Sequence, residues 1–205
     1  MERKIPWWFK RTEDPGRDTL RGDHTASASV SNGILQLLRQ HMVPDVIGSR
    51  EEIGLCTPEA HGDLALGLCL YDIRENDEMR INGMIPVDEN HQQFPPMYLN
   101  LYYMLTAYSS IDIRYREEEN HRILTRAMQV LHDHPLLDGS TLRPVTSSSP
   151  DTLHIQYQNL TMQEKLEIWQ GRKQECRLSL YYCVAPVRLD STVTKKITRV
   201  KEIWT

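Results

Sequence analysis

The sequence lacks the short motifs that mark the commonest catalytic and nucleotide-binding sites. It contains no GxxxxGKS/T, no GxGxxG after a predicted strand, no HExxH and no GxSxG. This absence removes the usual sequence signals of phosphate, dinucleotide, zinc and acyl-transfer sites. We therefore expect no catalytic residue, no cofactor and no bound metal, and we predict that the protein is not an enzyme.

The sequence also lacks a surplus of positive charge and a long apolar run. Its 205 residues carry a formal net charge of -4, whereas binding along nucleic acid needs a basic surface. No apolar stretch approaches the roughly 20 residues of a membrane helix, and the charged start lacks the apolar segment of a secretory signal. We therefore expect assembly in the cytoplasm, without contact to nucleic acid or membrane.

Cysteine and histidine give little support to a metal or redox site. No CxxC pair occurs, and we interpret the cysteines as buried free thiols: Cys56, Cys69, Cys176 and Cys183. A metal-dependent enzyme would need three converging ligands, and His121, His132 and His134 are the candidates. Because residues two apart on a helix point about 200° apart, we favour a helix terminus whose imidazoles meet free carbonyl groups. The metal-dependent enzyme stays as the lesser alternative.

A cluster of acidic residues follows the first long predicted strand. An acid pair serves general acid–base catalysis in many enzymes. Here two arginines are interleaved with the acids, which favours a solvated ion-pair loop. The cluster contains Asp72, Glu75, Asp77, Glu78, Arg74 and Arg80.

Apolar residues at helical spacing predict three helices. The first begins at Ser27 or Ser29, either of which can cap free amides, and it ends before Pro44. The second covers 117–134. The third, shorter helix begins with a capping box of Thr161 and Glu164. The predicted buried stripes are Ile123, Leu124, Ala127, Met128 and Leu131 in the second helix, and Met162, Leu166 and Trp169 in the third.

Alternating apolar residues predict strands over 64–73, 97–108, 153–157 and 177–189. The third strand has Leu153, Ile155 and Tyr157 on its buried side. Pro186 cannot donate to a ladder, so the end of the fourth strand is predicted to be an edge or a bulge. These elements predict an α+β fold: a mixed sheet of about four or five strands flanked by two or three helices.

Two terminal segments flank this pattern. We divide the chain into an N-terminal arm (1–26), a central domain (27–191) and a C-terminal tail (192–205). The arm mixes charges, proline and glycine with the aromatic triplet Trp7-Trp8-Phe9. Such a segment cannot build its own core, so the triplet must cover a surface on its own domain or on a partner. The tail is basic and amphipathic, and we expect a docking helix or an extra strand.

Six stretches, in this order, resemble a known family. They are SVSNGILQLLRQH (29–41), LCLYDIREN (68–76), PMYLNLYYMLTAY (96–108), HRILTRAMQVLHDHPLL (121–137), LTMQEKLEIW (160–169) and LSLYYCVAPVRLDS (178–191). Together they are similar to the Pvc16-like domain of tail terminators, or caps, in extracellular contractile injection systems. MQVLHDHP is the most distinctive of these motifs.

The resemblance implies an assembly role and no reaction. Terminators of this kind form a sixfold ring on the distal end of the inner tube and sheath, where they end elongation and stabilise the particle. The implied fold is that of phage tail terminators, a mixed sheet flanked by helices. The implied partners are a homohexameric ring, the sheath protein and the inner tube protein. Another structural component of the same machine, such as a collar or baseplate protein, remains the alternative.

Exposure arguments give candidate contact residues for such a role. The edge region 186–189, with Arg188, and the polar-aromatic face of Tyr98 and Tyr102 are candidates for contacts within a ring. Both terminal segments are candidates for docking onto sheath or tube by strand addition. Their candidate residues are Trp7, Trp8, Phe9, Lys195, Lys196 and Trp204.

Overall fold

A computed structural model describes residues 25–88, 90–137, 152–170 and 175–196. Its main element is a six-stranded mixed sheet with strand order β1-β2-β5-β8-β7-β6. The pair β1–β2 is parallel, and the other pairs are antiparallel. The strands are β1 (Ile53–Leu55), β2 (Leu66–Glu75), β5 (Met97–Ala107), β6 (Leu136–Leu137), β7 (Leu153–Tyr157) and β8 (Ser179–Leu189). The predicted α+β class is confirmed, and the two short edge strands β1 and β6 raise the number above the predicted four or five.

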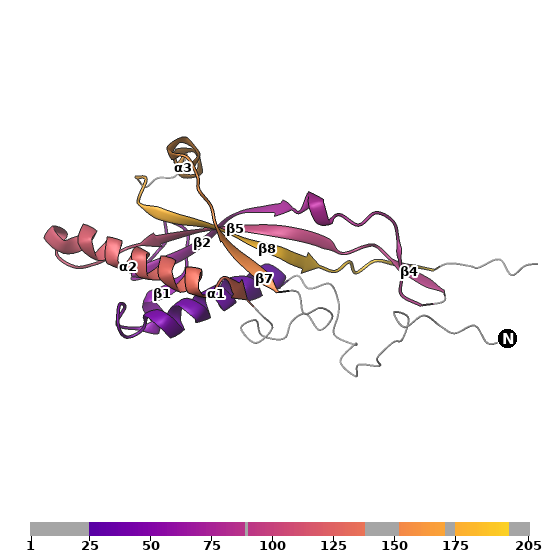
Figure 1. Cartoon of the computed structure of the whole chain (residues 1–205), viewed down its shortest axis with the longest axis horizontal. Helices are drawn as coiled ribbons and strands as arrows, with labels where there is room; N and C mark the ends of the chain where they lie inside the picture. Colours follow the sequence, from indigo (N-terminus) through magenta and orange to yellow (C-terminus); the bar gives the residue numbers. More distant parts are fainter. Residues whose placement is uncertain (1–24, 89, 138–151, 171–174, 197–205) are drawn as a thin grey trace, which may run out of the picture.

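Two helices cover one face of this sheet, as Figure 1 shows. These are α1 (Ala26–Met42) and α2 (Ile113–Asp133), and they enclose the large core together with the sheet. Leu38 and Met42 of α1 and Ala127 of α2 are fully buried in it. The predicted serine cap is wrong: α1 begins at Ala26, so both serines lie inside the helix. The second helix begins earlier than predicted, because the Asp112 side chain accepts a hydrogen bond from the Arg114 amide.

The opposite face of the sheet carries only the short helix α3 (Met162–Trp169) and a small second core. Trp169 is buried there, and its Nε1 donates a hydrogen bond to the Tyr181 hydroxyl at 3.1 Å. The predicted capping box is confirmed, but the predicted inward stripe is wrong. Met162 and Leu166 are 67% and 49% exposed because α3 is anchored through its last residue and stands away from the sheet.

The strands β2, β5 and β8 continue beyond the helices to a second, three-stranded sheet of order β3-β4-β9. We call residues 73–98 and 187–196 the projecting end. Its short elements are a 3-10 helix (Asp77–Met79), β3 (Ile85–Pro86), β4 (His91–Gln93) and β9 (Thr194–Lys196). Another 3-10 helix (Arg50–Glu52) precedes β1. Among the described residues, no helix is long and apolar enough to cross a membrane.

The sequence predicts an edge or a bulge at Pro186, and the structure has both there. Leu99 pairs with Val187 and Leu101 pairs with Val184, so two residues of β8 oppose Asn100, which is a bulge. The last pair between β7 and β8 is His154 with Ala185. Among the described strands, none pairs with β8 on its β7 side after Ala185.

Candidate assembly surfaces

The projecting end exposes an unusual number of large apolar side chains. Phe94 and Val193 are 51% and 52% exposed and adjoin the neighbouring strands β4 and β9 of its small sheet. Clustered exposed apolar residues mark interaction surfaces, whereas single ones are ordinary. The exposed apolar set is Ile73, Met79, Ile81, Ile85, Phe94, Met97 and Val193. These exposed apolar side chains make the projecting end suited to contact with a partner.

Specific hydrogen bonds hold the projecting end in shape in the absence of a large core. The Asn76 amide donates to the Tyr98 carbonyl at 2.7 Å, and the Asn76 side chain donates to the Asn100 side-chain oxygen at 3.0 Å. The Phe94 amide donates to the Val193 carbonyl at 3.3 Å, which joins the two chain segments. The apolar side chains are thus presented on an ordered backbone.

Salt bridges surround this surface. Arg74 pairs with Asp72 at 2.6 Å and Arg80 with Glu75 at 3.5 Å, so the predicted ion pairs are confirmed. The predicted loop is wrong for Asp72, Arg74 and Glu75, which lie in β2. The Asp88 carboxylate accepts from the Asn90 amide and contacts His91, and these interactions hold the pKa of Asp88 below its usual range. Exposed pairs of this kind add little stability and are suited to setting the orientation of a partner.

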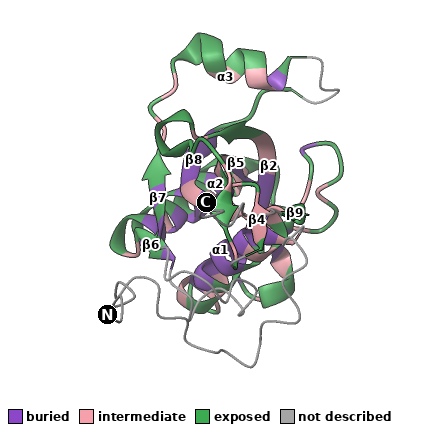
Figure 2. Ribbon diagram, turned by 90° about the vertical axis from the view of Figure 1, so that its right-hand side faces the viewer, coloured by how far each residue is buried: buried purple, intermediate pink, exposed green. Residues whose placement is uncertain are grey.

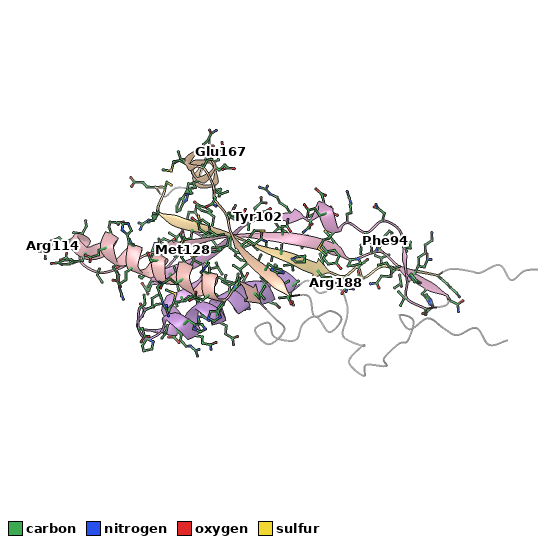
Figure 3. All side chains as sticks on the ribbon, viewed as in Figure 1. Phe94, Tyr102, Arg114, Met128, Glu167 and Arg188 are labelled. Atoms are coloured by element: carbon green, nitrogen blue, oxygen red, sulfur yellow. The ribbon has the colours of Figure 1, made fainter. Side chains whose placement is uncertain are left out.

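The predicted ring-contact residues lie on adjacent strands. Tyr98 on β5 pairs with Arg188 on β8, and Arg188 contacts Asp190 at 2.8 Å. Tyr102 lies nearer the body of the molecule, half-buried beside Tyr71, and the Arg74 guanidinium stands 4.9 Å above its ring. Figure 3 shows Tyr102 and Arg188 between the helices and Phe94.

The terminal candidates are described only in part. Lys195 and Lys196 lie in β9, are exposed, and pair with Gln92 and His91 of β4. This part of the tail is a strand, one of the two forms expected for it. Trp7, Trp8, Phe9 and Trp204 lie outside the described residues.

The histidines do not converge. His121 is exposed on α2, and the ring of His134 stacks on that of His41 with centroids 4.4 Å apart. Among the described residues, no group of three histidine, cysteine or acidic side chains is arranged to hold a metal ion. The arrangement that the metal-dependent alternative requires is not found in this part of the chain.

The cysteines differ from one another in exposure. Cys69 and Cys183 are buried free thiols, as predicted. Cys56 is half-buried, and its burial raises the pKa of the thiol to about 11. Cys176 is exposed, so the prediction of burial is wrong at this position. It lies between α3 and β8, outside the helices and strands.

A second apolar surface lies on the body of the molecule. A groove of about 450 Å³ runs between α2 and β7, and we call it the α2–β7 groove. Met128 and Tyr157, both predicted to be buried, are 37% and 40% exposed at this groove. The Tyr157 ring meets that of Tyr182 edge to face, with centroids 5.4 Å apart.

The family profile described as "Pvc16 N-terminal domain" matches residues 29–202. The chain belongs to the Pvc16 N-terminal domain family. This match covers the whole body of the molecule and its projecting end, which are therefore properties of one family domain. Among curated proteins, no sequence match was found.

Two solved structures have the same fold. One is described as the sheath/tube terminator of an extracellular contractile injection system, PVC, in the extended state, at 18% identity and a TM-score of 0.61. It is aligned over 87% of this chain and 61% of its own. The other is the tube-terminating cap of the anti-feeding prophage, at 18% identity and a TM-score of 0.54, over 86% of this chain and 59% of its own. The chain thus spans about three fifths of the length of either cap.

Sequence reasoning missed the apolar surface of this Pvc16-type domain's projecting end. The polar residues 74–96 predict a long connection or an extended hairpin, and the antiparallel pair of β3 and β4 is such a hairpin. The available signal was weak: Met79, Ile81, Ile85 and Phe94 recur in an otherwise polar stretch. Because single exposed apolar residues are ordinary, their grouping on one surface could be recognised only from the structure.

Proposed function

We propose that this protein is a tail terminator, or cap, of a contractile injection system. In this proposal it forms a hexameric ring on the distal end of the inner tube and sheath, ends tail elongation and stabilises the particle. It is assembled in the cytoplasm and works as a structural component of that particle, without catalysis. The observation that carries the proposal is the ordered projecting end with its exposed apolar side chains, on a domain of the Pvc16 N-terminal family.

The physical requirement of a terminator explains why such an end is needed. A polymer of stacked rings grows because each ring leaves an adhesive surface, and unpaired strand edges are one such surface. A terminator must fit that surface on one side and offer none on the other. Identical subunits that contact head to tail must also close into a ring.

We assign ring closure and docking to two separate surfaces of the protein. The outer part of β8 after Pro186, with Arg188 and the neighbouring Tyr98 and Tyr102, is our candidate for the contact between subunits. The projecting end and the C-terminal tail are our candidates for docking onto tube and sheath. The small sheet ends in β9, whose Lys195 and Lys196 are exposed for strand addition or for contact with acidic residues.

The test is imaging of particles from cells that lack the protein, complemented with variants. Wild type should restore tails of uniform length with density for the protein at the distal tip. The double variant Phe94→Ser/Val193→Ser should fold but leave tails of uncontrolled length, because it removes apolar contact area from the projecting end. Ile113→Ser, at the 76% exposed start of α2, is the matched control and should restore uniform tails.

Two outcomes would overturn the proposal. Density for the protein at the collar or baseplate would make it another structural component of the machine. Tails of normal length in cells without the protein would show that it does not end elongation.

A further inference from the structure

The α2–β7 groove combines an apolar surface with an incomplete strand edge. Its walls include Met128 and His132 of α2, and its floor includes Ile155, Tyr157 and Tyr182 of the sheet. Met128 and Tyr157 are exposed here, although they lie on the apolar faces of α2 and β7. Leu131 and Leu153 on the same faces are buried. A groove of this kind accepts the side chains of a docked segment.

Backbone groups of β7 along the groove are also available for hydrogen bonds to an added strand. Among the described residues, the outer strand β6 pairs with Leu153 and His154, and the Ile155 amide donates to the Pro135 carbonyl at 2.7 Å. The Gln158 amide donates inward, to the Tyr181 carbonyl at 2.8 Å. Since successive residues of a strand alternate in direction, the Tyr157 amide points outward, where no strand of the described chain lies.

A free edge beside an apolar groove is the arrangement that binds an added strand. Main-chain hydrogen bonds to the edge give affinity, and alternate side chains of the added strand enter the groove. The apolar lining of the groove suits an extended segment with large apolar side chains. Trp side chains suit it well, because the polar side chains of Thr125, Gln129 and His132 line the same groove and offer acceptors for an indole N–H.

We propose that the N-terminal segment of the same chain, through Trp7-Trp8-Phe9, docks in the α2–β7 groove as an added strand beside β7. It contains the largest apolar cluster of the residues that precede Thr25, flanked by Lys4 and Lys10. The described chain starts at α1, which packs directly against α2. The 15 residues 10–24 span up to roughly 50 Å when extended, which is ample to reach a groove on the neighbouring helix.

Docking in this way has a consequence for the free protein. An unpaired edge with an apolar border is a site for unwanted strand pairing between copies. The added segment covers that edge and keeps β7 from pairing with other chains. This inference does not depend on the terminator function.

Hydrogen exchange of the Tyr157 amide in the full-length protein tests the proposal. At low micromolar concentration the amide should be protected in the wild type. In Trp7→Ser/Trp8→Ser/Phe9→Ser it should exchange at least about tenfold faster, as expected when a 1.4 kcal/mol contact is lost. Leu20→Ser, which removes an apolar side chain of the same segment outside the triplet, should leave the protection unchanged.

A groove variant gives an independent readout. Met128→Glu places a charge at the open wall of the groove and should reproduce the faster exchange of Tyr157, while exchange of buried α1 amides stays as in the wild type. Equal Tyr157 exchange in the wild type and the triplet variant would overturn the proposal. Protection that appears only as protein concentration rises would also overturn it, because a second copy would then be the occupant.

Discussion

The strands β2, β5 and β8 each run through two different regions of the molecule. In the body they are buried beneath α1 and α2, as at Leu68, Leu105 and Val184. In the projecting end β2 and β5 are exposed at Ile73 and Met97, whereas β8 is still buried at Val187 and half-buried at Arg188 and Leu189. Figure 2 shows the buried residues gathered in the body and exposed ones at the periphery.

This difference teaches that continuous backbone pairing does not require continuous burial. Hydrogen bonds between strands carry the order of the body into a region that has no large core of its own. Apolar residues in the body stabilise the fold, whereas those of the projecting end are available to a partner. Mutations in the body should therefore impair folding, whereas mutations in the projecting end should impair assembly.

The largest expected effect is a loss of stability from a change in the body. Leu38 on α1 is fully buried, and Leu38→Ala should lower the free energy of unfolding by about 3 kcal/mol, because it removes transfer energy and leaves a cavity. Urea denaturation followed by circular dichroism measures this. Phe94→Ala in the projecting end should change the stability by less than about 0.5 kcal/mol. Similar losses for the two variants would remove the distinction between the regions.

A smaller effect is expected on the α3 face of the body. Tyr181→Phe removes the hydroxyl that accepts the buried Trp169 Nε1–H and should cost about 1–2 kcal/mol in unfolding free energy. The double-mutant cycle with Trp169→Phe measures the coupling between the two side chains. Additive effects of the single changes would show that the hydrogen bond adds no stability to this small second core.

Deletion of 195–205 should affect assembly more than stability. It removes two of the three β9 residues that pair with β4, all of them exposed, so the unfolding free energy should change by about 0.5 kcal/mol or less. In particles, the truncated protein should cap the sheath poorly, and tail-length distributions measure this. Unchanged capping would count against a role for the tail.

The smallest effect concerns pH and the helix α3. The Thr161 hydroxyl and amide donate to Glu164, which holds the pKa of this carboxyl below its usual value. The folded-state pKa is depressed, so the stabilisation is present above the unfolded-state pKa and is lost as pH falls through the folded-state pKa. Trp169 fluorescence should change in this acidic range, before the circular dichroism of the body does. Thr161→Ala should abolish the separate fluorescence step.

The sequence predicted the body well because its elements are long and regular. The stripes of α1 and α2 and the alternation of β5 and β8 recur over many residues, which makes the period unambiguous. The small sheet of two- and three-residue strands has no such period and could not be predicted.

The candidate surfaces were harder to predict, for a physical reason. An apolar stripe predicts that its side chains are buried, but it does not show whether they are buried by the same chain or by a partner. Met162 and Leu166 on α3 and Met128 on α2 follow helical periods and are nevertheless exposed. Arg188 was proposed from its place near a predicted strand edge, and Tyr98 from the polar-aromatic face of its strand; the structure places these two residues opposite each other on β8 and β5.

The bulges on either side of β5 set the direction in which the projecting end leaves the body. Tyr71 is extra in β2 relative to β5, and Pro186 lies at the extra residue of β8. Each bulge leaves the pairs beyond it in register with β5, but it bends the strand and increases its twist. Deleting a single residue at either bulge would therefore keep Ile73 opposite Leu101, or Val187 opposite Leu99, and would remove the local bend. The orientation of the projecting end is thus fixed in the middle of the sheet, far from the side chains that it presents.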